Sequence, residues 1–122
     1  MSAHRERAGG VSAFAPATVA NLGPGFDVLG LALAGPGDTV TARFAAERGV
    51  RIVSITGDGG ALPADAQRNT AGIAAARTLE RAGVAVGVEL EIAKGLPIGS
   101  GLGSSAASAA AAALAVNVLV GS

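Results

Sequence analysis

The sequence contains, at positions 97–107, the run Pro97-Ile98-Gly99-Ser100-Gly101-Leu102-Gly103-Ser104-Ser105-Ala106-Ala107. Its three alternating glycines can adopt backbone conformations closed to other residues and allow a ligand to approach the chain closely. An Ala-rich apolar stretch follows, which predicts a helix from about Ser104. Because the first N–H groups of a helix lack intrahelical partners and lie at the positive end of its dipole, the run predicts a phosphate-binding loop.

The glycine spacing differs from that of two familiar phosphate loops. A Walker A loop reads G-x-x-x-x-G-K-S/T, and no lysine follows these glycines; a dinucleotide fingerprint reads G-x-G-x-x-G, whereas this loop reads G-x-G-x-G. A flexible glycine turn before a helix is the alternative, and Pro97 argues against it because proline stiffens the start of the loop. Ser104 and Ser105 can each cap the helix or reach a phosphate oxygen or Mg²⁺, and the residues alone leave both roles open.

A second turn-rich stretch lies nearer the N-terminus. It reads Pro16-Ala17-Thr18-Val19-Ala20-Asn21-Leu22-Gly23-Pro24-Gly25-Phe26-Asp27-Val28-Leu29-Gly30. Asn21 offers a donor and an acceptor, and Asp27 offers a carboxylate, on either side of a constrained turn. Both could therefore contact one small hydroxylated or amino-bearing ligand. The motif alone favours the alternative, in which each side chain stabilises its own turn.

The hydrophobic pattern around these motifs predicts a mixture of strands and helices. The predicted elements are strands at 11–18, 39–45 and 50–56, a helix at 70–82, a strand at 84–93 and a helix from 104. Asn69 can cap the first helix and Gly83 can end it. Glu89 and Glu91 alternate with branched residues, so one face of their strand is apolar and the other charged. This order of elements predicts an α+β domain with helices packed on a sheet.

Composition excludes several classes of protein. Nine basic residues balance nine acidic ones, so the basic surface typical of nucleic-acid binding is not expected. The absence of cysteine excludes disulfides and thiolate metal sites, and agrees with the cytoplasm. Residues 1–10 are polar and charged, and we expect a short disordered leader there. The apolar stretch at 106–120 is too short and too rich in alanine for a membrane span, which favours a buried helix.

The two motifs resemble those of a known family. Residues 97–106 are similar to the second signature of the GHMP kinase superfamily, P-x-G-x-G-L-G-S-S-A, and residues 16–30 resemble the first signature of homoserine kinases, P-A-T-x-A-N-L-G-P-G-F-D-x-L-G. Val19 replaces a small polar residue often found at its position. The resemblance covers essentially all of the chain beyond the leader. It implies the α+β fold of the GHMP kinase N-terminal domain over 11–122, incomplete and without the family's C-terminal domain.

The resemblance also implies roles for individual residues. Residues 97–107 would surround the phosphates of ATP, and the hydroxyl of Ser105, or alternatively Ser104, would help to hold Mg²⁺. Asn21 and Asp27 would bind homoserine, with Asp27 facing its ammonium group. Asn69 would lie near adenine, although the residues following it depart from the family pattern and a helix cap is the alternative. No residue is assigned as a catalytic base.

The implied activity is ATP-dependent phosphorylation of the side-chain hydroxyl of L-homoserine to O-phospho-L-homoserine, a step of threonine biosynthesis. The family's Mg²⁺-binding glutamate and its second domain have no counterpart in these 122 residues, so we expect the chain alone to bind nucleotide weakly and to be inactive. A homodimer remains open for a full-length protein. The alternatives are a GHMP kinase for another alcohol, a non-catalytic nucleotide-binding module, and a structural protein with an Ala-rich packing helix.

Overall fold

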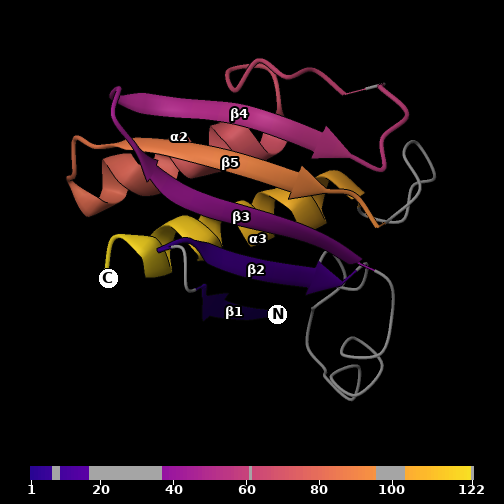
Figure 1. The fold of residues 1–122 in the computed structure, drawn as a ribbon, viewed down its shortest axis with the longest axis horizontal. Coiled ribbons are helices and arrows are strands. Elements are labelled where there is room, and N and C mark those ends of the chain that lie inside the picture. Colours follow the sequence, from indigo (N-terminus) through magenta and orange to yellow (C-terminus); the bar gives the residue numbers. More distant parts are fainter. Residues whose placement is uncertain (7–8, 17–36, 61, 96–103, 122) are drawn as a thin grey trace.

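The computed structural model describes residues 1–6, 9–16, 37–60, 62–95 and 104–121. These residues form one mixed sheet with two helices, which confirms the predicted α+β class (Figure 1). The strands are β1 (Ser2–Arg5), β2 (Val11–Pro16), β3 (Gly37–Ala45), β4 (Gly49–Thr56) and β5 (Gly87–Ala93). The helices are α2 (Thr70–Ala82) and α3 (Ser104–Leu119).

The strands lie in the order β1-β2-β3-β5-β4. Neighbouring strands are antiparallel except β4 and β5, which are parallel and are connected through α2. Parallel neighbours need such a crossover, since a tight hairpin can only join antiparallel strands. As a result, the C-terminal ends of β2, β4 and β5 lie at the same end of the sheet, where β3 begins (Figure 1).

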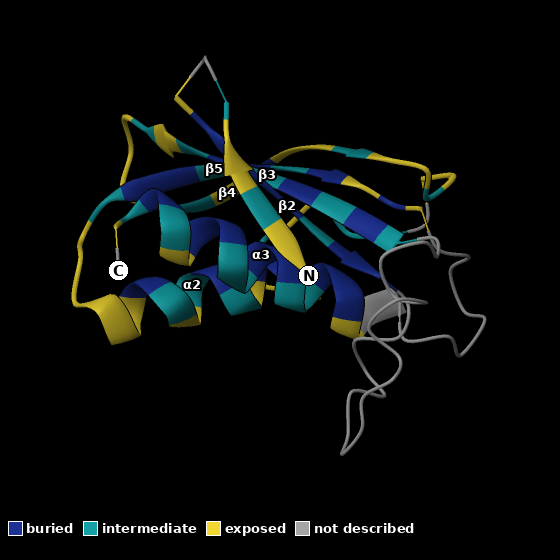
Figure 2. Ribbon diagram, turned by 90° about the horizontal axis from the view of Figure 1, so that it is seen from below, coloured by how far each residue is buried: buried dark blue, intermediate teal, exposed yellow. Residues whose placement is uncertain are grey.

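Both helices cover one face of the sheet (Figure 2). Alternate residues of the central strands point toward them and are buried, namely Val40 and Ala42 on β3 and Val88, Leu90 and Ile92 on β5. The side of α3 that packs inward is built mostly from alanine, with Ala107, Ala111, Ala112 and Ala115 all fully buried. Small side chains let the helix approach the sheet closely, so an apolar core forms with few aromatic residues.

Helix α2 begins and ends where the sequence predicts. Asn69 is its N-cap, and the side-chain Oδ1 accepts a hydrogen bond from Ala71 N at 2.9 Å. Gly83 ends the helix in the left-handed region with φ of 70°, and Val84 N donates to Leu79 O at 3.3 Å. This closing turn includes Val84, so the following strand begins at Gly87 and the predicted start at residue 84 is wrong.

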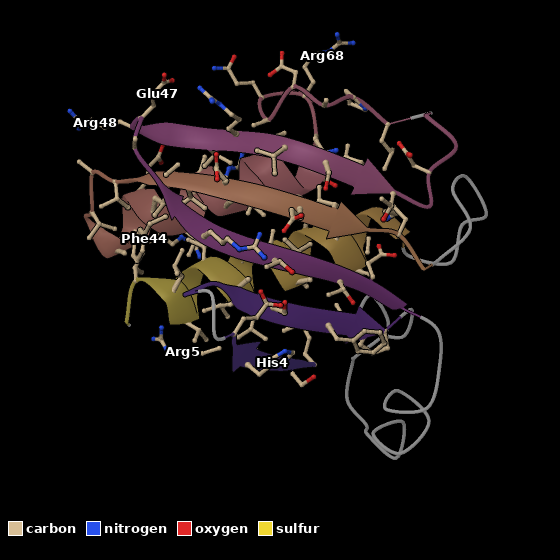
Figure 3. All side chains as sticks on the ribbon, viewed as in Figure 1. His4, Arg5, Phe44, Glu47, Arg48 and Arg68 are labelled. Atoms are coloured by element: carbon tan, nitrogen blue, oxygen red, sulfur yellow. The ribbon has the colours of Figure 1, made fainter. Side chains whose placement is uncertain are left out.

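The disordered leader expected over residues 1–10 is also wrong, because residues 2–5 form the edge strand β1. Its backbone pairs with β2 in the register Ser2↔Phe14 and Arg5↔Val11, and Ala3 packs against the core. The guanidinium of Arg5 donates to Val118 O near the end of α3 at 2.7 Å, where a cation complements the helix dipole. Edge-strand pairing uses backbone groups, so polar residues such as His4 and Arg5 (Figure 3) are compatible with it.

Polar side chains cover the sheet face opposite the helices. Ser12 and Thr41 share a hydrogen bond of 2.7 Å across β2 and β3. Arg43 on β3 pairs with Glu91 on β5 and, at 3.1 Å, with Glu6. The hydrogen bond to Glu91 raises the pKa of the Arg43 guanidinium above its ordinary value. Because these groups are roughly one-third exposed or more, such pairs contribute at most about 1 kcal/mol each.

The apolar C-terminal stretch forms a packed helix, as the sequence predicts. Helix α3 lies against β2, β3 and α2. No helix within the described residues is long and apolar enough to cross a membrane.

Replacing Gly72 by alanine tests the packing of α2. A glycine in a helix interior usually destabilises by about 1 kcal/mol relative to alanine. Here a Cβ on Gly72 would lie 2.3 Å from Ala66 O, so we expect Gly72→Ala to lower the free energy of unfolding by about 1–3 kcal/mol instead. Urea denaturation measures the change. Arg77→Ala on the exposed side of α2 is the control, expected to stay within about 0.5 kcal/mol, and a stabilised Gly72→Ala would contradict the packing.

Candidate functional site

Most of the predicted site residues lie outside the described part of the chain. These are Asn21, Asp27, Pro97, Ile98, Gly99, Ser100, Gly101, Leu102 and Gly103. Ser104 and Ser105 form the first two residues of α3, Ala106 is exposed and Ala107 is buried. Asn69 is described in full. The residues that flank both motifs are also described, and their contacts show how these flanks are placed relative to each other.

The flanks of the two motifs meet at one corner of the sheet. Pro16, which precedes segment 17–36, pairs with Gly37, which follows it. Gly95, which precedes segment 96–103, packs so closely against Gly37 that a Cβ on Gly95 would lie 2.0 Å from Gly37 O. Glycine is therefore needed at position 95 for the two backbones to touch. We call Pro16, Gly37, Asp38, Lys94 and Gly95 the motif corner.

A buried ion pair holds the motif corner together. Lys94 Nζ lies 2.5 Å from Asp38 Oδ2, and the two side chains are 2% and 0% exposed. Lys94 Nζ also donates to Ser108 Oγ on α3 at 2.7 Å, and Ser108 Oγ lies 2.9 Å from Asp38 Oδ2. The other carboxylate oxygen, Asp38 Oδ1, accepts from Gly95 N at 2.9 Å. Asp38, Lys94 and Ser108 each make further interactions besides these bonds.

The residue pattern alone does not predict this cluster. Asp38 follows a glycine turn and Lys94 follows a strand, and each has an ordinary role as a polar residue beside a turn. The two residues are 56 positions apart in the sequence, so no local spacing links them. Ser108 is one of two polar residues in the otherwise apolar stretch 106–120, which is a weak signal that its hydroxyl has a buried partner.

The N-terminus of α3 lies beside this cluster, because Ser108 is in the helix's first turns. The first turn contains no acidic residue. The positive end of the helix dipole is therefore not neutralised by a carboxylate of that turn. The predicted preference for an anion at the helix start stays a prediction.

Asn69 has the role that the helix-cap alternative predicts. Besides accepting from Ala71 N, its side-chain amide donates from Nδ2 to Pro63 O at 3.0 Å, and the residue is only 5% exposed. These bonds orient both ends of the amide toward the protein. Its contact with adenine stays a prediction.

The loop after β4 borders the motif corner. Lys94 N donates to Thr56 O at 2.8 Å, and a Cβ on Gly57 would lie 2.3 Å from Lys94 O. Within this loop, the Asp58 carboxylate accepts from Gly60 N and Leu62 N, both at 3.0 Å. Because these N–H groups favour the charged form, that of Gly60 most, they lower the pKa of the Asp58 carboxyl below its ordinary value.

The described residues do not by themselves offer a magnesium site. They contain no group of three or more histidine or acidic side chains that could hold a metal. Asp38, the buried carboxylate nearest the motifs, already faces the ammonium of Lys94.

Comparison with known families and proteins identifies relatives. The family model described as GHMP kinases N terminal domain matches residues 69–122. A homoserine kinase of Arabidopsis thaliana is 57% identical over 117 residues, which cover 91% of this chain and 31% of the relative. A homoserine kinase of Chloroherpeton thalassium is 49% identical over 122 residues, which cover 92% of this chain and 38% of the relative.

The fold is also similar to that of a solved structure. The crystal structure of homoserine kinase from Cytophaga hutchinsonii matches with a TM-score of 0.78 and 46% identity. The match covers 97% of this chain and 38% of that one. The chain therefore spans about a third of the length of the relatives it matches.

Two substitutions of Asn69 separate its two predicted roles. Asn69→Ala removes the cap and should lower the free energy of unfolding by about 1 kcal/mol. Asn69→Ser keeps a side-chain acceptor for Ala71 N and should retain most of the stability while losing the amide donor to Pro63 O. Thermal unfolding and ATP affinity measured together check both roles. Lower ATP affinity in a stable Asn69→Ser variant would indicate an adenine contact, and unchanged affinity would leave Asn69 as a cap alone.

The low pKa of Asp58 predicts a pH effect on its loop. Because its pKa is lower in the folded than in the unfolded protein, the ionised form stabilises the loop above about pH 4, and this is lost as the pH falls through the folded value. NMR titration of the carboxyl group and of the Gly60 and Leu62 amides measures the midpoint. We expect it below the midpoint of an aspartate in an unstructured peptide. A midpoint that is not lowered, or the same amide shifts in Asp58→Asn, would contradict the hydrogen bonds.

Proposed function

Since this chain is a homologue of homoserine kinases and has the fold of the GHMP kinase N-terminal domain, we propose that the protein transfers the γ-phosphoryl group of ATP to the side-chain hydroxyl of L-homoserine. The observation that carries the proposal is the 57% identity to a homoserine kinase over 91% of the chain. The convergence of the two motif flanks at one corner supports it, because a phosphate loop and a substrate loop must be close neighbours for this transfer.

The phosphate side of the proposed site consists of residues 97–107. Backbone N–H groups of the glycine loop and of the start of α3 would surround the phosphates of ATP. The helix dipole contributes only about 0.3–2 kcal/mol, so several N–H bonds and cations are needed to hold a triphosphate. Asn69 is proposed to lie near adenine, in addition to capping α2.

The substrate side of the proposed site is the segment between Pro16 and Gly37. Asn21 and Asp27 would bind the amino acid, with the Asp27 carboxylate pairing with its ammonium group. Such a pair would favour an amino acid over an alcohol that lacks an amino group. This distinguishes homoserine from the substrates of other kinases of the superfamily, such as mevalonate.

The reaction depends on positioning more than on a reactive side chain. The homoserine hydroxyl oxygen forms a bond to the γ-phosphorus, the bond from that phosphorus to the bridging oxygen of ADP breaks, and the hydroxyl proton is released. Magnesium would enter with ATP and neutralise phosphate charge. We propose that this chain contributes the hydroxyl of Ser105, or alternatively that of Ser104, to holding the magnesium ion. No catalytic base is assigned, and we propose that the reaction takes place in the cytoplasm.

A non-catalytic nucleotide-binding module is the second candidate function. It applies to the 122 residues taken alone, which span 31–38% of the relatives' length. For the 122 residues alone, we therefore expect no turnover and weak nucleotide binding.

ADP release tests the proposal. The product of the complete reading frame is assayed with magnesium and ATP against L-homoserine, L-serine, mevalonate and galactose, alongside the 122-residue chain. We expect release only from the complete product with L-homoserine. Asn21→Ala and Asp27→Asn should each raise the KM for homoserine at least tenfold, since removing one partner of a charge-assisted hydrogen bond costs about 1.5–3 kcal/mol.

Other outcomes of the same assay would overturn parts of the proposal. ADP release with mevalonate or galactose would leave the proposed ATP site standing but would show that the substrate is not homoserine. If no substrate gives release while ATP still binds, the nucleotide-binding module is the correct function. Heat-inactivated protein sets the background rate.

A further inference from the structure

One carboxylate connects both motifs. Asp38 lies two residues after segment 17–36, and its Oδ1 accepts the N–H of Gly95, the residue that precedes segment 96–103. Its Oδ2 lies 2.5 Å from Lys94 Nζ and 2.9 Å from Ser108 Oγ on α3. A single buried group therefore touches the chain directly before the glycine loop and the helix directly after it.

The position of this carboxylate cannot shift independently of its neighbours. Asp38 has no exposed surface, and a buried charge is stable only while it is paired and hydrogen-bonded. If Lys94 moves, Asp38 must move with it or lose its hydrogen bond to Gly95. Any displacement of β3 at its first residues would likewise change the start of the glycine loop.

We propose that Asp38, Lys94 and Ser108 are positioning residues that couple segment 17–36 to segment 96–103, so that ATP and the amino acid bind interdependently. This inference rests on the proposed function. The three residues act through the loops they hold, because their side chains are buried against one another in the interior of the corner. They are positioning residues, and loss of the cluster should weaken the binding of both ligands together.

A second ion pair provides a matched control. Arg43 and Glu91 join the same two strands, β3 and β5, but on the polar face of the sheet. Arg43 is 35% exposed, and its pairs lie several residues away from the motif corner. Removing this pair tests whether any ion pair between β3 and β5 affects the ligands, or only the one beside the motifs.

The experiment uses the product of the complete reading frame with magnesium and ATP. The variants are Lys94→Met, the double variant Asp38→Asn/Lys94→Met, and the control Arg43→Met. The measurements are the KM for ATP, the KM for L-homoserine, kcat and the midpoint of thermal unfolding. The double variant matters because it removes the ion pair without leaving a buried charge unpaired, so it separates stability from positioning.

We expect Lys94→Met to raise both KM values at least tenfold and to lower the unfolding midpoint. The double variant should recover the unfolding midpoint toward that of the wild type while both KM values stay at least tenfold raised. Arg43→Met should change each KM less than twofold. If Lys94→Met does not fold, the double variant and the control decide the question.

Four results would overturn the inference. Recovery of both KM values together with stability in the double variant would mean that the cluster is only structural. A raised KM for ATP alone would make Lys94 a nucleotide contact and not a coupling residue. If Arg43→Met raised both KM values as much as Lys94→Met does, the effect would come from any ion pair between β3 and β5 and not from the cluster. A wild-type protein that is inert with every substrate refutes the proposed function, and the inference falls with it.

Discussion

The burial of the Asp38 carboxylate is the constraint on which the candidate site depends. A charged group without solvent contact requires a paired cation and hydrogen bonds to both oxygens, and the fold supplies them from Lys94, Ser108 and the Gly95 backbone. These partners belong to the end of β5 and the start of α3. Satisfying one carboxylate therefore fixes the first residues of β3, the last of β5 and the first turns of α3 relative to one another.

The remaining charges are distributed differently. Arg43, Glu6 and Glu91 form ion pairs on the polar face of the sheet, where water reduces both their desolvation cost and their contribution to stability. On the opposite face, the branched residues of β3 and β5 and the alanines of α3 form the core. The apolar core gives the domain its layers, and the buried Asp38–Lys94 pair sets the geometry of a single corner.

The sequence predicted the elements whose signals are local. Helix α2 begins and ends as expected because Asn69 and Gly83 carry the capping signals within the helix's own sequence. The start of β5 was misplaced because the apolar alternation continues through Val84, which the turn after α2 uses for its closing hydrogen bond. Strand β1 was missed because its pairing with β2 is a tertiary contact made by backbone groups, which polar side chains neither favour nor prevent.

The same distinction applies to the site. The glycine loop and the Asn21–Asp27 motif could be recognised from residue type and spacing. The ion pair between Asp38 and Lys94 could not, because it joins residues 56 positions apart that become neighbours only when β3 and β5 pair. Sequence thus indicated which chemistry to expect, and the structure showed that the flanks of the two motifs meet at one corner.

If the proposed function is correct, ATP binds at the motif corner. An NMR titration of the ¹⁵N-labelled product of the complete reading frame with magnesium and ATP tests it most directly. We predict that amide shifts concentrate at Asp38, Lys94, Gly95 and the first turn of α3. Shifts centred instead on the hollow beside Glu47 and Arg48, at the opposite end of the sheet (Figure 3), or no shifts in the folded protein, would contradict it.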